Sequence, residues 1–245
     1  TRERELRIEG DDFSICFDPM SGRMTSYISG GREWLAGPLR LTFWRPPTDN
    51  DRGNGMPSRC APWKTAESHL RLNHFQRFEV HTGDGSLRLT FHLDILVGES
   101  RAQLEYRIHG DGSIDVSVEL IPGGEDLPPL PRVGMMCEIR PELRDWEWFG
   151  RGPWENYRDR NTGSPVGVYE GSIDDLWFPY LEPQETANRT DIRWASFTDK
   201  EGAGLRITTA DNQLLEVGAY PFLQSDLEGP KHPHEIPSRD LITVQ

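Results

Sequence analysis

Apolar and polar residues alternate along much of the chain, most clearly between Phe78 and Leu120. In that stretch, apolar side chains occupy every second position of three runs: Leu87, Leu89, Phe91 and Leu93; Leu104, Tyr106 and Ile108; Ile114, Val116, Val118 and Leu120. Because successive side chains of a β-strand point to opposite faces, this period of two predicts three half-buried strands. The segments Gly83-Asp84-Gly85-Ser86 and Gly110-Asp111-Gly112-Ser113 suit the positive φ of tight hairpins and predict a meander.

Shorter alternating segments predict further strands on both sides of this meander. They cover residues 13–17, 24–28, 39–44, 204–208 and 214–217, and several are closed by turn residues such as Asp18-Pro19-Met20-Ser21-Gly22. Residues 63–75 lack strand alternation, and the spacing of Ala66, Leu70 and His74 predicts a short helix there. Many short strands at intervals of roughly ten residues indicate an all-β sandwich or barrel.

Composition limits the classes of partner that such a domain can bind. The 245 residues carry a formal net charge of -13, which disfavours nucleic acid and anionic membranes as partners because like charges repel. No apolar run approaches the ~20 residues needed to span a bilayer. The three cysteines, Cys16, Cys60 and Cys137, lack metal or disulfide spacing, so we expect isolated buried thiols.

Three motifs concentrate the residues that carry chemistry. They are Arg45-Pro46-Pro47-Thr48-Asp49-Asn50-Asp51-Arg52-Gly53, then Gly150-Arg151-Gly152-Pro153-Trp154-Glu155-Asn156-Tyr157-Arg158-Asp159-Arg160, and finally Pro179-Tyr180-Leu181-Glu182-Pro183-Gln184-Glu185 followed by an arginine-rich strand. In this order they resemble the C-terminal domain, of the small-chain or domain 5 type, of family 2 glycoside hydrolase β-galactosidases.

The resemblance implies a large antiparallel two-sheet supersandwich that is similar to galactose mutarotase. It also implies one domain over residues 1–245, truncated at its C-terminal end, because the family domain continues for several strands beyond Gln245. A cloned fragment and a separate small subunit both fit that expectation. The compartment, cytoplasmic or periplasmic, stays open.

Glycoside hydrolysis needs two carboxyl groups about 5–10 Å apart, and 40 acidic residues give no basis for choosing a pair. In the family, both catalytic glutamates and the magnesium and sodium sites lie in a preceding (β/α)₈ barrel, the partner that the resemblance implies. We therefore expect no catalytic residue, metal or cofactor in this chain, and no activity from it alone. The resemblance further implies a galactoside substrate and an oligomeric parent enzyme.

The segment from Asp49 to Arg59 is the first candidate site. Asp49, Asn50 and Asp51 have the oxygen donors of a cation loop, although a turn in which these side chains bond their own backbone is the better-supported interpretation. In the family, the loop that begins at the position of Gly53 is mobile and borders the active site. The resemblance thus assigns this role to Asp49, Asn50, Asp51, Gly53, Asn54 and Arg59.

A second group of polar residues either faces the barrel or sugar, or forms a hydrogen-bonded structural loop. Its members are Glu155, Asn156, Tyr157, Arg160, Glu185 and Arg189. Trp154, Tyr157, Trp177, Tyr180 and Trp194 carry rings that can stack on a sugar, and packing explains each equally well. His232 and His234 have metal-like spacing but no further ligands, so we expect an exposed loop.

Three functions remain open at this stage. The first is an accessory domain of a β-galactosidase, which shapes and covers the active site. The second is a mutarotase-like aldose epimerase, and the third is a noncatalytic carbohydrate-binding module. An epimerase needs a histidine acid opposite a glutamate base. A binding module would hold sugar in isolation.

Overall fold

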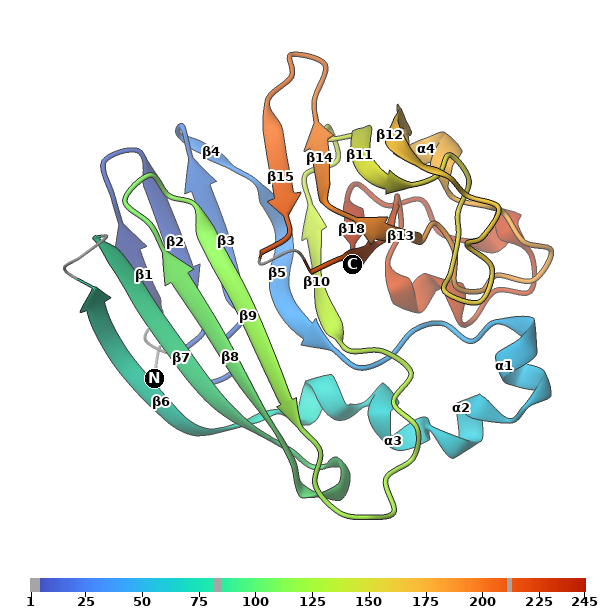
Figure 1. The fold of residues 1–245 in the computed structure, drawn as a ribbon, viewed down its shortest axis with the longest axis horizontal. Helices are drawn as coiled ribbons and strands as arrows, with labels where there is room; N and C mark the ends of the chain where they lie inside the picture. The colour runs from blue at the N-terminus through green and yellow to red at the C-terminus, as the bar shows by residue number, and fades with distance from the viewer. Residues whose placement is uncertain (1–4, 82–84, 211–212) are drawn as a thin grey trace. The chain divides into compact units, whose positions relative to one another are not determined.

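The structure is a computed structural model that describes residues 5–81, 85–210 and 213–245. Its regular structure is mostly antiparallel strand, and the longest described helix has five residues (Figure 1). The all-β prediction is therefore confirmed. No helix in the described ranges is long and apolar enough to cross a membrane.

The chain divides into two compact units, which are described separately. The first combines Thr1–Arg45 with Asn54–Met135, and the second combines Pro46–Gly53 with Met136–Gln245. The single domain expected over residues 1–245 stays a prediction.

Two antiparallel sheets form the first unit. One contains β1 (Leu6–Glu9), β2 (Phe13–Phe17), β3 (Met24–Ser29), β4 (Arg32–Glu33) and β5 (Leu35–Thr42). The other is the predicted meander of β6 (Arg71–His81), β7 (Ser86–Ile95), β8 (Ser100–Ile108) and β9 (Ile114–Ile121), paired in chain order (Figure 1). Short helices α2 (Met56–Arg59), α3 (Ala61–Lys64), η1 (Ala66–His69) and η2 (Val97–Glu99) complete this unit.

Aromatic side chains join these two sheets. The ring centroid of Phe17 on β2 lies 4.8 Å from that of Tyr106 on β8 and 6.4 Å from that of Phe91 on β7. All three residues are fully buried, and the Tyr106 hydroxyl donates a hydrogen bond to the carbonyl of Gly22 at 2.9 Å. The alternating apolar faces thus meet in one core, as the period of two requires.

The second unit is built around the four-stranded sheet β12-β11-β14-β15. These strands are β11 (Asp145–Arg151), β12 (Val166–Ser172), β14 (Trp194–Thr198) and β15 (Gly204–Thr208). Beside them, β13 (Arg189–Ile192) pairs with β16 (Leu215–Val217), and β18 (Ile242–Val244) pairs with β10 (Gly134–Ile139) and β17 (Ala219–Tyr220). The helices are α1 (Asp49–Gly53), α4 (Ile173–Leu176), η3 (Gln224–Leu227) and η4 (Pro233–Glu235).

Two local predictions need comment. The helix expected in residues 63–75 is limited to α3 and the single turn η1, and β6 already begins at Arg71, so the prediction is wrong for residues 71–75. Long-range pairing of β6 with β7 outweighs the weak helical spacing there. The turn at residues 83–86 lies partly outside the described residues.

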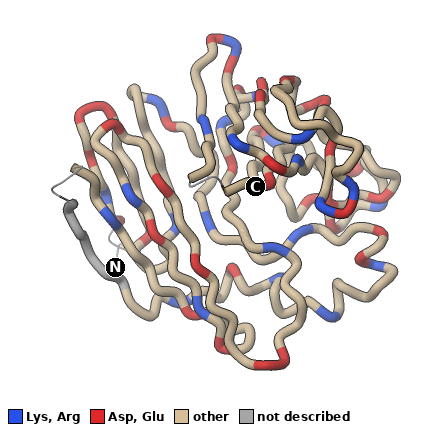
Figure 2. Tube along the Cα trace, in the orientation of Figure 1, with Lys and Arg blue, Asp and Glu red and all other residues tan. Residues whose placement is uncertain are grey.

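The three cysteines are free and buried, as expected. Lysine and arginine positions are interspersed with aspartate and glutamate along the trace of both units (Figure 2). The excess of acidic over basic residues is therefore spread over many helices, strands and loops.

The turn between β8 and β9 is expected to require glycine at position 112. Gly112 has φ +84°, and a Cβ there would lie 2.9 Å from the Phe13 ring. Gly112→Ala should lower the free energy of unfolding by about 1–3 kcal/mol in urea titrations. The control is Gly110→Ala, because its φ is not positive and its Cβ would meet nothing within 4 Å. Equal stability of the two variants would contradict this prediction.

Candidate functional site

The first motif folds into the short helix α1, which begins with reciprocal hydrogen bonds. The Asp51 carboxylate accepts bonds from the backbone nitrogen and the hydroxyl of Thr48, both at 2.9 Å, and the Asp51 backbone nitrogen donates to the Thr48 hydroxyl at 3.3 Å. This is the geometry of a capping box. The Asp51 carboxylate thus bonds local backbone, whereas the Asp49 carboxylate accepts bonds from the Arg52 and Gln184 side chains. Among the described residues no group of three or more His, Cys, Asp or Glu is placed to hold a metal.

Helix α1 is bonded to the third motif. The Asp49 backbone nitrogen donates to the side-chain oxygen of Gln184 at 3.2 Å, and the Gln184 amide returns a bond to the Asp49 carboxylate at 3.2 Å. Arg52 donates to the carbonyl of Pro183 at 2.8 Å and lies 3.4 Å from the Glu182 carboxylate. Asn50 is exposed. Two motifs more than a hundred residues apart in sequence are therefore joined directly.

Asn54 and Arg59, the last two candidates of the first segment, belong to the first unit, whereas Gly53 ends the second-unit stretch. Arg59 donates to the backbone carbonyl and the side-chain oxygen of Asn54, at 2.8 and 3.1 Å. Gly55 lies between the two helices with φ +76°. A Cβ at Gly53 would meet nothing within 4 Å, and Gly53 does not have a positive φ. The segment expected to be one loop is two short helices linked by a glycine turn.

Glu155 connects the second motif to the third. Its carboxylate accepts hydrogen bonds from the Ala187 backbone nitrogen at 2.8 Å, the Thr186 hydroxyl at 3.0 Å and Arg160 at 2.7 Å. The Tyr180 hydroxyl also donates to it. Burial, together with this bond to Glu155, raises the pKa of Tyr180 to about 12. A nearly buried carboxylate with four donors is a structural anchor.

Asn156 performs a similar linking role and is fully buried. Its side-chain oxygen accepts bonds from the backbone nitrogen of Thr190 at 3.0 Å and from its hydroxyl at 2.6 Å. Its backbone nitrogen donates to the Asn188 carbonyl at 2.8 Å. Tyr157 is half-buried, and the Arg160 guanidinium lies 4.7 Å from its ring centroid.

Arg189 lies in the core with its guanidinium 5.1 Å from the ring centroids of both Trp146 and Trp148. It donates to the carbonyls of Ala187 at 2.8 Å, Leu176 at 3.0 Å and Pro153 at 3.3 Å. Burial lowers the pKa of Arg189 to about 10, so the side chain stays charged at neutral pH. One arginine thus connects the end of α4 with the segments around Pro153 and Ala187.

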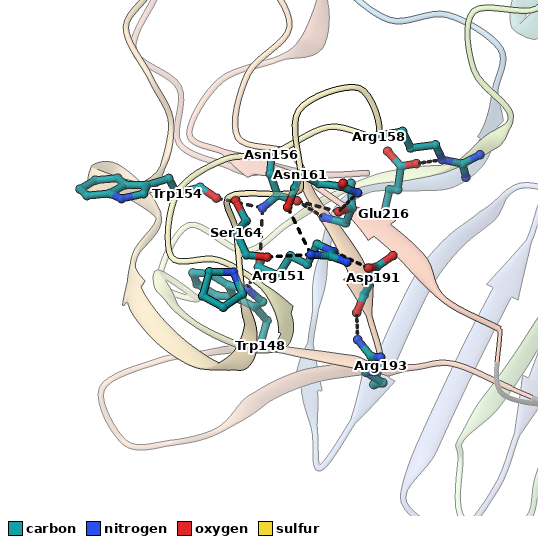
Figure 3. A network of polar contacts seen from close by, with 12 residues as sticks. Trp148, Arg151, Trp154, Asn156, Arg158, Asn161, Ser164, Asp191, Arg193 and Glu216 are labelled. Carbon is teal, nitrogen blue, oxygen red and sulfur yellow. Dashed lines mark hydrogen bonds and ion pairs between the residues drawn. The ribbon is translucent and has the colours of Figure 1, made fainter.

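Arg151 organises the rest of the second motif (Figure 3). It pairs with the Asp191 carboxylate and donates to the carbonyls of Ser164 at 2.9 Å and Asn161 at 3.2 Å. Asp191 was missed by the sequence analysis, although an acid following Arg189 in the motif-bearing segment was a usable signal. The Trp154 ring points away from this network (Figure 3) and is 79% exposed.

The other candidates lie apart from the Glu155 cluster or pack against neighbours. Glu185 is buried and accepts a bond from the Gln245 amide at 2.9 Å. The Arg206 guanidinium lies 4.3 Å from the Trp194 ring, and Trp177 packs edge-on against Phe222. The rings of His232 and His234 stack on each other at 5.5 Å.

The structure therefore bonds Asp49, Glu155 and Asn156 to residues 182–190 in the second unit. Arg160 joins this cluster through Glu155, and Arg189 joins it through the carbonyls of Ala187 and Pro153. These contacts favour the structural interpretation of the polar cluster. The roles of the individual residues in a galactosidase site stay predictions.

Comparison with known proteins identifies the family. The sequence model described as "Beta galactosidase small chain" matches residues 9–245. The chain is 32% identical over 243 residues to a β-galactosidase from Priestia megaterium, covering 99% of this chain and 23% of the relative. It is 34% identical over 231 residues to a β-galactosidase from Lactobacillus delbrueckii subsp. bulgaricus, covering 94% and 22%.

A β-galactosidase from Halalkalibacterium halodurans is 30% identical over 241 residues, with 98% of this chain and 24% of the relative covered. The chain thus spans about a quarter of the length of these relatives. With the family model matching nearly every residue, the chain belongs to the β-galactosidase small-chain family.

Proposed function

We propose that this chain is the accessory domain of a family 2 β-galactosidase that hydrolyses terminal non-reducing β-D-galactose residues. It shapes and covers the active site, while a preceding (β/α)₈ barrel supplies the acid and the nucleophile of a retaining double displacement. Magnesium and sodium belong to that barrel. The relatives, of which the chain spans about a quarter, have ample length for such a barrel.

The observation that carries this proposal is the connection among the three motifs. In the second unit, α1 is bonded to residues 182–184, and Glu155 and Asn156 are bonded to residues 186–190. The polar side-chain groups of Asp49, Glu155 and Asn156 make structural hydrogen bonds, as expected of a framework that holds a surface in place. A catalytic carboxyl group would instead need an open face toward substrate.

Apolar side chains beside this framework support a partner surface. Leu181 is 90% exposed, Trp154 is 79% exposed and Phe178 is 55% exposed. Side chains of this size at adjoining loops are typical of a surface that another domain covers. The barrel of the same enzyme is the partner we propose for it.

The Gly53→Ala variant tests the role of the first motif in the intact enzyme. The added methyl meets no atom within 4 Å, and Ala suits a helix, so stability should be unchanged or higher by up to about 1 kcal/mol. If the segment must move at the active site, kcat or KM for a chromogenic β-galactoside should change severalfold.

Gly229→Ala is the matched control, because its Cβ also meets nothing within 4 Å and its φ is not positive. It should keep the kinetics of the parent. Wild-type kinetics for Gly53→Ala would count against an active-site role for this segment.

A further inference from the structure

The second unit contains a pocket of 210 Å³ formed by residues of four separate segments. Trp177, Phe222 and Ile236 supply apolar walls, while Arg144, Asp174 and Arg239 supply polar ones. None of the candidate residues in the first and second motifs lines it. The pocket therefore needs an explanation separate from the proposed active-site role.

The size of the pocket limits its occupant. Pockets for drug-sized ligands have volumes of about 300–1,000 Å³. A volume of 210 Å³ suits one small ring better than an extended chain.

Both arginines that line the pocket are paired with carboxylates, of which Asp174 also lines it. Arg144 lies 2.5 Å from the Asp174 carboxylate, and Arg239 donates two bonds to Asp226, at 2.8 and 3.0 Å. Each guanidinium thus has a carboxylate partner, so a phosphate or another anion would compete with a bond already made. The Arg144–Asp174 pair, in which both side chains line the pocket, instead offers neighbouring donors and acceptors, which suit the hydroxyls of a neutral ligand.

The apolar walls complement this polar pattern. Trp177 is partly buried against the core cluster of Ala187, Tyr220, Phe222 and Leu227, which restrains its ring. Pro221, Pro233 and Pro237 also line the pocket and restrict its backbone. A fixed indole beside a polar rim can hold the C–H face of a sugar while the rim bonds its hydroxyls.

We propose that this pocket is a carbohydrate-binding site, separate from the catalytic site of the parent enzyme, that takes one neutral pyranose ring. The pocket would hold this sugar ring away from the glycosidic bond that the parent enzyme cleaves. The proposed accessory role does not depend on this site, and failure of one leaves the other standing.

Calorimetric titration of the 245-residue chain with methyl β-D-galactopyranoside tests the proposal. Saturable binding with a Kd on the order of 1–10 mM is expected, because a single ring buries little surface. Trp177→Ala should weaken binding at least about tenfold through loss of ring stacking. Trp154→Ala, which removes an exposed tryptophan that does not line the pocket, should bind like the wild type.

The double variant Arg144→Ala/Asp174→Ala is a second test that does not disturb the core. The side chains of this pair are 36% and 51% exposed, so its removal should preserve folding, and sugar binding should weaken about fivefold or more. Inorganic phosphate should not displace the sugar. The proposal fails if wild type shows no saturable binding, if Trp177→Ala and the double variant both bind normally, or if phosphate competes for the site.

Discussion

Arg189→Ala is expected to lower the free energy of unfolding by about 3–5 kcal/mol. The substitution removes a fully buried side chain from between Trp146 and Trp148 and leaves a cavity there. It also leaves the carbonyls of Ala187, Leu176 and Pro153 without the donor that bonds them. Urea titration of the 245-residue chain measures the effect.

Arg189→Met separates packing from hydrogen bonding. Methionine fills much of the same volume without a charge, and burial already disfavours the charge of Arg189. The Met variant should therefore recover roughly half of the stability lost in the Ala variant. A loss below about 1 kcal/mol for Arg189→Ala would show that this side chain does not hold together the segments around Pro153, Leu176 and Ala187.

Glu155→Ala is expected to lower the free energy of unfolding by about 2–4 kcal/mol. The carboxylate is bonded to the backbone nitrogen of Ala187, a fully buried residue with φ +68°, a conformation rarely adopted outside glycine. Without Glu155, that buried nitrogen and the hydroxyls of Thr186 and Tyr180 lose an acceptor. The loop of residues 178–188 should then exchange its amide hydrogens faster, as hydrogen exchange would detect.

Glu155→Gln keeps one acceptor oxygen and removes the charge, so its cost should be smaller. It should also lower the pKa of Tyr180 from about 12 toward 10, because the carboxylate helps to raise that pKa. The raised pKa contributes stability below pH 10 that is lost as pH rises toward 12. Absorbance of the tyrosinate during alkaline titration reports this shift, and an unchanged curve would contradict the assigned contact.

Strand positions were predictable because their cause is local. In β8, Leu104, Tyr106 and Ile108 are buried and the residues between them are less so, which follows from the side-chain period of a strand. The helix α1 also had a local signal, since Thr48 and Asp51 are spaced for a capping box. The predicted turn, in which acidic side chains bond local backbone, holds for Asp51 but not for Asp49, and the helix itself was not predicted.

The polar cluster could be recognised in the sequence, but its contacts could not be assigned. The carbonyl partners of Arg189 lie as many as 36 residues away, and Gln184 lies 135 residues from Asp49. Such pairs depend on how the strands and loops pack, and residue spacing carries no information about that. The family resemblance singled out the three motifs, and the structure shows how their side chains are bonded within the second unit.

The most direct test of the proposed function is the rate at which the pure 245-residue chain hydrolyses a chromogenic β-galactoside. The chain should be prepared from a host without its own β-galactosidase, so that contaminating enzyme cannot contribute. Because we place the acid and the nucleophile in the barrel, the predicted rate is no higher than that of buffer alone. Steady turnover that copurifies with the chain would contradict an accessory role and would place catalytic groups within these residues.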